Sequence, residues 1–383
     1  MFEIPIGWLQ LKREKLRFAV ALLGVTFAVV LILMQLGFRE ALFRSAVRFH
    51  EALDGDIVII SREIPVIAQP YAFSNRRLYQ ARGVDGVESV TPVYIGLAPW
   101  KNPETHGVRV IFVVGIDPAG RVLRLDEVNA QRSTIALEDA VLFDELSRPE
   151  FGPIAASLRS GTPVDVEVSN RRLRVAGLYR LGTSFGIDGS VVTSETNFLR
   201  IFPGRQRGVI ELGLARVAPG RDPERVRDAI RALLPTDVEV LTRSQFAQRE
   251  VDYWDSSTPI GYVFSFGVIV GMVVGGIIVY QILFADVNDH LPEYATLKAM
   301  GYSNAFLSGV VIQQAVILAV LGFVPGAAVS ILLYRVSSDA TRLPLEMTPE
   351  RALAVLGLTI AMCTLAALMA LRKVRSADPA EVF

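Results

Sequence analysis

The sequence predicts a membrane α-helical protein with four transmembrane helices and a large α+β extracytoplasmic (periplasmic) domain inserted between helices 1 and 2. Three observations lead to this fold class. Of the 383 residues, 51% are hydrophobic, and the mean hydropathy of +0.39 is a value that soluble domains rarely reach. Four segments are apolar over the roughly 20 residues that a helix needs to cross a bilayer. The long stretch between the first two of them is polar and alternates strand-like with helix-like patterns.

The apolar segments define the expected organisation of the chain. The first is not expected to be a cleavable signal peptide, because it is longer than an h-region and "GFREALFRSA" follows it. We expect a cytoplasmic amphipathic elbow at 1–17, transmembrane helices at 18–37, 260–284, 305–334 and 352–371, a stalk and periplasmic α+β domain at 38–259, a cytoplasmic loop at 285–304, a short periplasmic loop at 335–351, and a cytoplasmic tail at 372–383.

The distribution of basic residues favours an orientation in which both termini are cytoplasmic. Four spans place both termini on one side, and the short segments on that side carry more Lys and Arg than the opposite short loop. Arginines at both ends of the long insert weaken this bias. The basic residues in question are Lys12, Arg13, Lys15, Arg17, Lys298, Arg372, Lys373 and Arg375 on the side of the termini, against Arg335, Arg342 and Arg351.

The insert is long enough for one sizeable domain or two small ones. The first span is expected to continue into it as a helical stalk through "REALFRSAVRFHEAL". "DIVII", "VESVTPVYIG" and "VRVIFVVGID" have the composition of strands, and "VDVEVSNRRLRVAG" that of a hairpin. Asp222 and Pro223 begin a predicted helix as N-cap and first helical residue. One interpretation of the insert is a folded domain without chemistry of its own.

Several kinds of chemistry are missing from the sequence. The apolar cores of the spans contain no Asp, Glu, Lys, Arg or His, which argues against an ion-coupled transporter or an intramembrane enzyme. No G-x-x-x-x-G-K-[ST] loop for ATP is present. The single cysteine, Cys363, and three scattered histidines suggest no metal site, and the zero net charge suggests no nucleic-acid partner. The chain is therefore predicted to be non-catalytic and to bind no cofactor. The energy for any transport would then have to come from another protein.

Glycines recur at every fourth position in two of the spans. They are Gly267, Gly271 and Gly275 in the second, and Gly322 and Gly326 in the third. Small residues on one face let two helix backbones approach closely. This pattern is compatible with an interface that slides or dimerises, and equally with packing inside one bundle.

The N-terminal segment "PIGWLQLKREKLRF" sets Trp8 against the basic residues Lys12, Arg13, Lys15 and Arg17. It has the character of an amphipathic elbow lying at the membrane interface. The alternative is a plain basic flank that only orients the first span.

The polar segment "DVNDHLPEYATLKAMGYSNAF", between the second and third spans, predicts a short helix of about three turns. Asp289 is the expected N-cap, and Gly301 the expected C′ residue, with Leu297 and Tyr302 as the hydrophobic pair of a Schellman ending. Ser303 would then cap the third span. A short, partly apolar helix of this kind suits docking into a groove of another protein. The alternative is a simple connection resting on lipid headgroups.

The layout of one span, a large outer domain and three further spans resembles the FtsX/MacB-like permease family of ABC transporters. "PEYATLKAMGYSNAFL" is similar to the family's segment after the second span, and the C-terminal sequence "RKVRSADPAEVF" is similar to the family's usual C-terminal tail. More narrowly, "FSNRRLYQARGVDGVESVTPVYIGLAPWKNPET" and "LFDELSRPEFGP" resemble the cyanobacterial DevC permeases.

The resemblance implies partners and a mechanism. Members form dimers and work with a separate cytoplasmic ATPase, which binds ATP and docks on the short helix; its motion passes through the stalk to the outer domain. DevC-type members work with a membrane-fusion adaptor and a TolC-like outer-membrane protein in glycolipid export. An FtsX-like signal transducer and a lipoprotein-releasing permease are the alternatives. Carried onto this chain, the ATPase-docking residues would be Leu291, Glu293, Tyr294, Leu297, Lys298, Ala299, Met300 and Gly301. Pro292 and Tyr294 are bulkier than is usual there, so the pairing with an ATPase is expected to be selective.

Overall fold

The computed structural model describes residues 15–376 of the chain. These residues form two compact units. The first, called here the membrane unit, comprises the described parts of Met1–Ala41, Ile260–Thr341 and Leu345–Phe383. The second, called here the polar domain, comprises Leu42–Pro259 with Arg342–Pro344.

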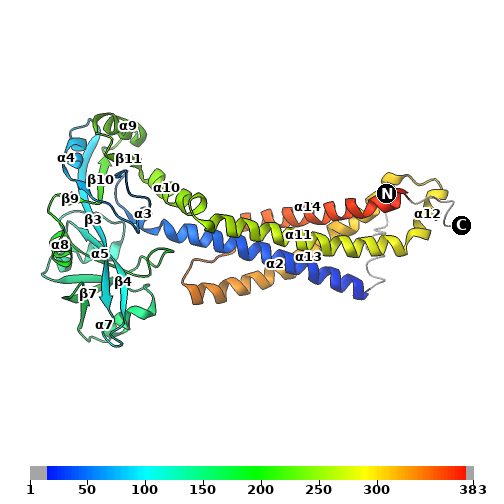
Figure 1. Cartoon of the computed structure of the whole chain (residues 1–383), viewed down its shortest axis with the longest axis horizontal. Helices are drawn as coiled ribbons and strands as arrows, with labels where there is room; N and C mark the ends of the chain where they lie inside the picture. The colour runs from blue at the N-terminus through cyan, green and yellow to red at the C-terminus, as the bar shows by residue number, and fades with distance from the viewer. Residues whose placement is uncertain (1–14, 377–383) are drawn as a thin grey trace. The chain divides into compact units, whose positions relative to one another are not determined.

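Four long helices in the described residues are apolar enough to cross a membrane, and they contain the four predicted spans. They run alongside one another as a bundle (Figure 1). The structure thus confirms the predicted fold class, with four membrane helices and an inserted mixed domain. The helices are α2 (Lys15–Ala46), α11 (Pro259–Asp289), α13 (Asn304–Thr341) and α14 (Pro349–Ser376), and the short helix α12 (Leu291–Ala299) connects α11 to α13.

Helix α2 contributes a continuous buried stripe to the core of the membrane unit. Its buried residues recur at intervals of three and four along one face, and each is at most 1% exposed. The opposite face is apolar and exposed, as a lipid-facing surface would be. The stripe consists of Ala21, Val25, Ala28, Val29, Ile32 and Leu33, packed against residues of α11, α13 and α14.

The polar domain is built on one sheet of nine strands in the order β11-β1-β10-β3-β4-β8-β5-β7-β6. Strand β3 belongs to both parts of this sheet, since its first half pairs with β10 and its second half with β4. The end of β3 also pairs with β6, so the strands from β3 through β4, β8, β5 and β7 to β6 form a closed ring. The buried Trp100 lies in the core beside this ring. The strands are β1 (Ile57–Ser61), β3 (Val87–Lys101), β4 (Val108–Ile116), β5 (Ala140–Asp144), β6 (Val164–Val168), β7 (Arg171–Tyr179), β8 (Ser190–Ser194), β10 (Leu212–Val217) and β11 (Val238–Thr242), with a separate pair β2 (Phe73–Ser74) and β9 (Val209–Ile210).

Local signals predicted several of these elements correctly. The β6–β7 hairpin turns at Ser169 and Asn170, which both have positive φ (49° and 62°), as a two-residue hairpin loop requires. Asp222 caps α9 by accepting a hydrogen bond from the Glu224 N–H at 3.0 Å. The helices of the domain are α3 (Arg48–Ala52), α4 (Arg76–Arg82), α5 (Asp126–Ala130), α6 (Arg132–Ile135), the 3₁₀ turn η1 (Pro149–Phe151), α7 (Ile154–Arg159), α8 (Glu195–Ile201), α9 (Pro223–Leu233) and α10 (Arg243–Ser256).

Glu211 is a buried carboxylate within the sheet. It accepts a hydrogen bond from the Ile95 N–H at 3.0 Å and pairs with Arg205 at 2.7 Å. Burial raises its pKa to about 7, from an ordinary value of 4.5. The folded state therefore holds this proton more tightly than the unfolded chain, so stability rises as the pH falls from about 7 towards 4.5. Above pH 7 the ionised group costs the folded state roughly 3 kcal/mol.

We expect Glu211→Gln to remove this pH dependence. Hydrogen exchange of the full-length protein, corrected for intrinsic rates, should show the β3 amides around Ile95 gaining protection as the pH falls through 7. The variant should show a flat profile. Glu167→Gln is the matched control, because Glu167 lies on the surface paired with Lys101. An unchanged slope in Glu211→Gln would contradict the assignment.

Candidate functional site

Helix α12 begins differently from the prediction. Asp289 does not cap it; α11 continues to Asp289, and the N-cap position is His290, without a side-chain cap. The Asp289 carboxylate instead pairs with Arg17 at the start of α2. Pro292 is tolerated because the first N–H groups of a helix have no intrahelical partner. The predicted cap was wrong because a distant ion pair competes for the same carboxylate.

The predicted end of α12 is confirmed. Gly301 has a φ of +93°, which favours glycine, and its N–H donates to the Lys298 carbonyl at 3.0 Å. The Tyr302 N–H donates to the Leu297 carbonyl at 3.1 Å, which completes a Schellman motif. The Ser303 hydroxyl accepts from the Phe306 N–H at 3.3 Å and caps α13. The turn between α12 and α13 is therefore fixed by local hydrogen bonds.

The two sides of α12 have different surroundings. Tyr294 is 3% exposed within the core of the membrane unit, and Leu297 packs against the same core. Tyr294 was predicted to dock a partner, but its side chain lies inside the bundle and holds the helix in place. The exposed side, called here the outer face of α12, consists of Glu293, Thr296, Ala299 and Met300. Met300 is 63% exposed, which is high for so apolar a side chain.

A buried polar contact lies at the base of α12. The Gln314 amide of α13 donates to the Asp286 carboxylate of α11 at 3.0 Å. His290 hydrogen-bonds through Nδ1 to the Asp286 carbonyl at 2.9 Å. Asp286 and His290 are 7% and 8% exposed, and Gln314 is fully buried. This contact joins the two helices that flank α12. The sequence analysis missed it, although a Gln inside an apolar span was an available signal.

The predicted glycine stripes both pack against α2 of the same chain. A Cβ at Gly275 would lie 2.5 Å from the Ala28 Cβ, and one at Gly326 would lie 2.8 Å from the Val29 Cβ. Real Cβ atoms do not approach so closely, so only glycine fits. Of the two alternatives, packing within one bundle is therefore what the described residues display. The other stripe residues behave alike: Gly267 faces Gln35, Gly271 faces Ile32, and Gly322 faces Val25.

At the opposite end of the bundle, Arg351 of α14 joins three helices. It is 7% exposed and pairs with the Glu40 carboxylate of α2. It also donates to the Tyr334 hydroxyl of α13 at 3.3 Å and to the Glu346 carbonyl at 2.8 Å. The Tyr334 hydroxyl donates to the Leu33 carbonyl of α2. We call this set the Arg351 cluster. Sequence analysis treated Arg351 only as a loop charge.

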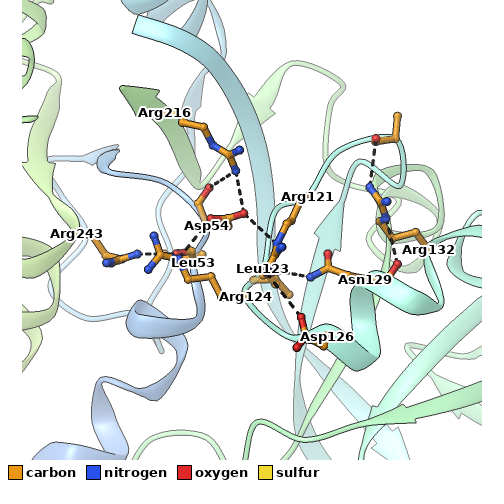
Figure 2. A network of polar contacts seen from close by, with 11 residues as sticks. Leu53, Asp54, Arg121, Leu123, Arg124, Asp126, Asn129, Arg132, Arg216 and Arg243 are labelled. Atoms are coloured by element: carbon orange, nitrogen blue, oxygen red, sulfur yellow. Dashed lines mark hydrogen bonds and ion pairs between the residues drawn. The ribbon is translucent and has the colours of Figure 1, made fainter. Parts of the chain in front are cut away.

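In the polar domain, an arginine cluster surrounds Asp54 just after α3 (Figure 2). The Asp54 carboxylate pairs with Arg216 of β10 at 2.8 Å, and with Arg121 and Arg124 at 3.3 Å each. Its N–H donates to the Val122 carbonyl at 2.8 Å. Burial, followed by the nearby charge of Arg124, lowers the pKa of Arg243 at the start of α10. Asp54 thus fastens the end of α3 to the sheet and to the segment before α5.

Comparison with known proteins agrees with this architecture. The MacB-like periplasmic core domain matches residues 18–233, more than half of the chain, and the FtsX-like permease C-terminal domain matches residues 265–379. The chain belongs to the FtsX/MacB-like permease family of ABC transporters. It is accordingly a multi-pass membrane protein and a permease subunit, and membership implies a cytoplasmic ATPase partner.

Solved structures with some similarity to this FtsX/MacB-like permease match about half of its length. The extracellular domain of the ABC-type transporter YknZ from Gram-positive bacteria has 15% sequence identity and a TM-score of 0.34, and the match covers 49% of this chain and 99% of that one. The periplasmic region of MacB from Actinobacillus actinomycetemcomitans has 13% identity and a TM-score of 0.34, over 54% and 96%. No curated protein matches the chain.

The predicted elbow falls only partly within the described residues of this permease. Lys15 and Arg17 lie in the first turn of α2, and Arg17 forms the ion pair with Asp289. Trp8, Lys12 and Arg13 lie outside the described residues. The elbow therefore stays a prediction.

Proposed function

We propose that this permease is the transmembrane subunit of an ABC exporter in the inner membrane, and that its ATPase docks on the outer face of α12. The observation that carries the proposal is the division of α12 into a buried side and an exposed side. Tyr294 and the Schellman ending fix the helix to the bundle, while Ala299 and Met300 stay accessible. A rigid helix held in this way can pass the motion of a bound ATPase to α11 and α13.

We further infer that two copies assemble, with both termini in the cytoplasm and the polar domain outside it. The excess of Lys and Arg on the side of the termini supports this orientation. ATP-driven motion would then reach the polar domain along α2 and α11, the two membrane helices whose chain continues into it. The partner ATPase binds the nucleotide, and the permease itself acts mechanically.

For the cargo, we propose a glycolipid or another amphiphile, delivered through a membrane-fusion adaptor and a TolC-like outer-membrane duct. The DevC-like stretches of sequence support this proposal. An apolar groove of about 700 Å³ between α11 and α14, lined by Met272, Tyr280, Phe284, Met362 and Met369, also supports a cargo with a hydrocarbon part.

The docking proposal is tested by co-purifying the permease with its cognate cytoplasmic ATPase. Ala299→Arg and Met300→Asp should each weaken the complex at least about tenfold, as expected when a charge enters an apolar contact. The matched control for Met300→Asp is Leu233→Asp, which places the same negative charge on an exposed apolar residue of the polar domain. Full ATPase binding by both α12 variants would overturn the proposal.

A second candidate function is an FtsX-like signal transducer that activates a partner outside the cytoplasm. The match of residues 265–379 to the FtsX-like permease domain favours it. It predicts the same ATPase docking, but no adaptor. A pull-down with the full-length protein separates the two functions: the exporter retains an adaptor, whereas the transducer retains an enzyme such as a cell-wall hydrolase.

A further inference from the structure

Glu211 is fully buried at the place where β3 changes its strand partner. The residue lies between β9 and β10 and is 0% exposed. Strand β3 pairs with β10 as far as Val93 and with β4 from Tyr94 onward. Just past this change, the Ile95 N–H donates to Glu211 Oε2 at 3.0 Å. The carboxylate thus satisfies a main-chain donor of β3 beyond the end of the β3–β10 pairing.

The other carboxylate oxygen of Glu211 has a charged neighbour but no hydrogen bond. Arg205 Nη1 lies 2.7 Å from Glu211 Oε1, and the Arg205 side chain is 30% exposed. Within the part of the chain that the structure describes, Oε1 accepts no hydrogen bond. A proton can therefore be added to Oε1 without displacing a donor. Adding it removes the negative charge that attracts Arg205.

Arg205 belongs to residues 202–208, called here the α8–β9 loop because it connects these two elements. Within the loop, the Arg205 N–H donates to the Phe202 carbonyl at 2.9 Å. At its end, the Gly208 carbonyl accepts from the Asn75 N–H at 2.8 Å, just before α4. The ion pair with Glu211 ties the middle of the loop to the sheet.

Opposing effects act on the Glu211 carboxyl. Burial favours its neutral form, whereas the Ile95 N–H and the Arg205 charge favour its ionised form. Burial prevails and raises the pKa of Glu211 to about 7, from an ordinary value of 4.5. Between these two values the folded state holds a proton that the unfolded chain releases, so the fold gains stability as the pH falls. The same proton removes the counter-charge of Arg205, so the α8–β9 loop loses its tie to the sheet.

Tyr94 of β3 and Glu195 of α8 are titratable groups near this site. Tyr94 interacts electrostatically with Glu211, but burial, followed by the charge of Glu195, raises the pKa of Tyr94, which is neutral around pH 7. Burial, followed by the charge of Asp117, raises the pKa of Glu195, and Arg207 of the loop opposes this shift. Because Glu195 is also a carboxyl with a raised pKa, its titration has to be separated from that of Glu211.

We propose that Glu211 and Arg205 form a pH-dependent latch in the polar domain. Above neutral pH the ion pair holds the α8–β9 loop against the sheet. At lower pH a proton on Glu211 Oε1 breaks the pair and releases the loop, while the sheet itself becomes more stable. The latch lies wholly within the polar domain and does not depend on the identity of the ATPase or the cargo.

Hydrogen exchange of the full-length protein on both sides of pH 7, corrected for intrinsic rates, tests the latch. Peptides containing the Arg205 and Val209 amides report on the loop, and peptides around Ile95 report on the sheet. As the pH falls through 7, we expect loop protection to drop about fivefold, as for a partly exposed ion pair, while sheet protection rises. A general loosening or tightening of the domain would move both in the same direction.

Variants at Arg205 separate the latch from a purely structural contact. Arg205→Gln should leave the loop weakly protected at every pH. It should also move the transition at Ile95 to higher pH, because the cation that favours the ionised carboxyl is gone. Arg205→Lys keeps the charge and should keep both transitions. Glu195→Gln is the matched control and should leave both transitions in place.

Glu211→Gln resembles the protonated carboxyl and should fix the loop in its released state at every pH. All three histidines are still present in this variant. A loop transition that persists in Glu211→Gln would therefore assign the pH response to another group and overturn the proposal. Loop protection that rises together with that of the sheet, or stays constant as the pH falls, would overturn it as well.

Discussion

Replacing Gly326 by leucine is expected to destabilise the membrane unit by about 3 kcal/mol, because overpacking of a close helix contact has no room to relax. A Cβ at this position would lie 2.7 Å from the Val29 Cγ1, 2.8 Å from the Val29 Cβ and 3.1 Å from the Thr26 carbonyl oxygen. The last of these is a backbone atom, so a change of rotamer cannot relieve the overlap. Helix α13 would have to move away from α2, and the contacts around Val25 and Gly322 would separate with it.

Gly357→Leu is the matched control for this prediction. Gly357 also lies in the middle of a membrane helix, but nothing lies within 4 Å of a Cβ built there. Both substitutions add the same side chain and raise helix propensity equally, so their difference isolates the contact with α2. Titration with sodium dodecyl sulfate in mixed micelles, followed by circular dichroism, measures the stability of each. If the two variants unfolded at the same detergent fraction, the close contact of Gly326 with α2 would contribute nothing to the stability of the membrane unit.

The glycine spacing shows how far sequence reasoning reaches in this protein. A period of four small residues predicted a close helix approach, because that depends only on side-chain volume. It did not identify α2 as the partner, since every apolar span offers a similar surface. The Gly301 ending of α12 was predicted correctly for the opposite reason: its hydrogen bonds join residues at most five positions apart.

Polar contacts between distant segments were the main omission. Asp54 lies 162 positions from Arg216, and Glu40 lies 311 positions from Arg351. Nothing in the local sequence links these charges, because charged residues near the ends of membrane helices also serve as topogenic or interfacial groups. The misplaced cap at Asp289 has the same origin. The Asp289 carboxylate was suited to capping α12, but Arg17 lies close to it in space and forms an ion pair with it instead.

The Arg351 cluster leads to an asymmetric prediction: Glu40→Gln should cost more stability than Arg351→Met. Arg351 is 7% exposed, whereas the Glu40 side chain is 41% exposed. Removing the carboxylate leaves a buried cation with only the neutral acceptors Tyr334 and Glu346 C=O, at a cost of about 3 kcal/mol. Removing the arginine leaves a carboxylate that water can reach, and Met retains much of the packing volume, so about 1 kcal/mol is expected.

A double-mutant cycle in the same detergent titration measures this coupling. With Met at position 351 there is no buried cation to strand, so the further change Glu40→Gln should then have almost no effect. Equal costs for the two single variants would show that the pair behaves as an ordinary exposed salt bridge. A cost confined to Glu40→Gln would instead show that Glu40 is the counter-ion that allows a charge to be buried where α2, α13 and α14 meet. In that case one electrostatic contact would hold together the ends of α2, α13 and α14 that meet at Arg351, while the glycine packing holds α13 against α2 further along the bundle.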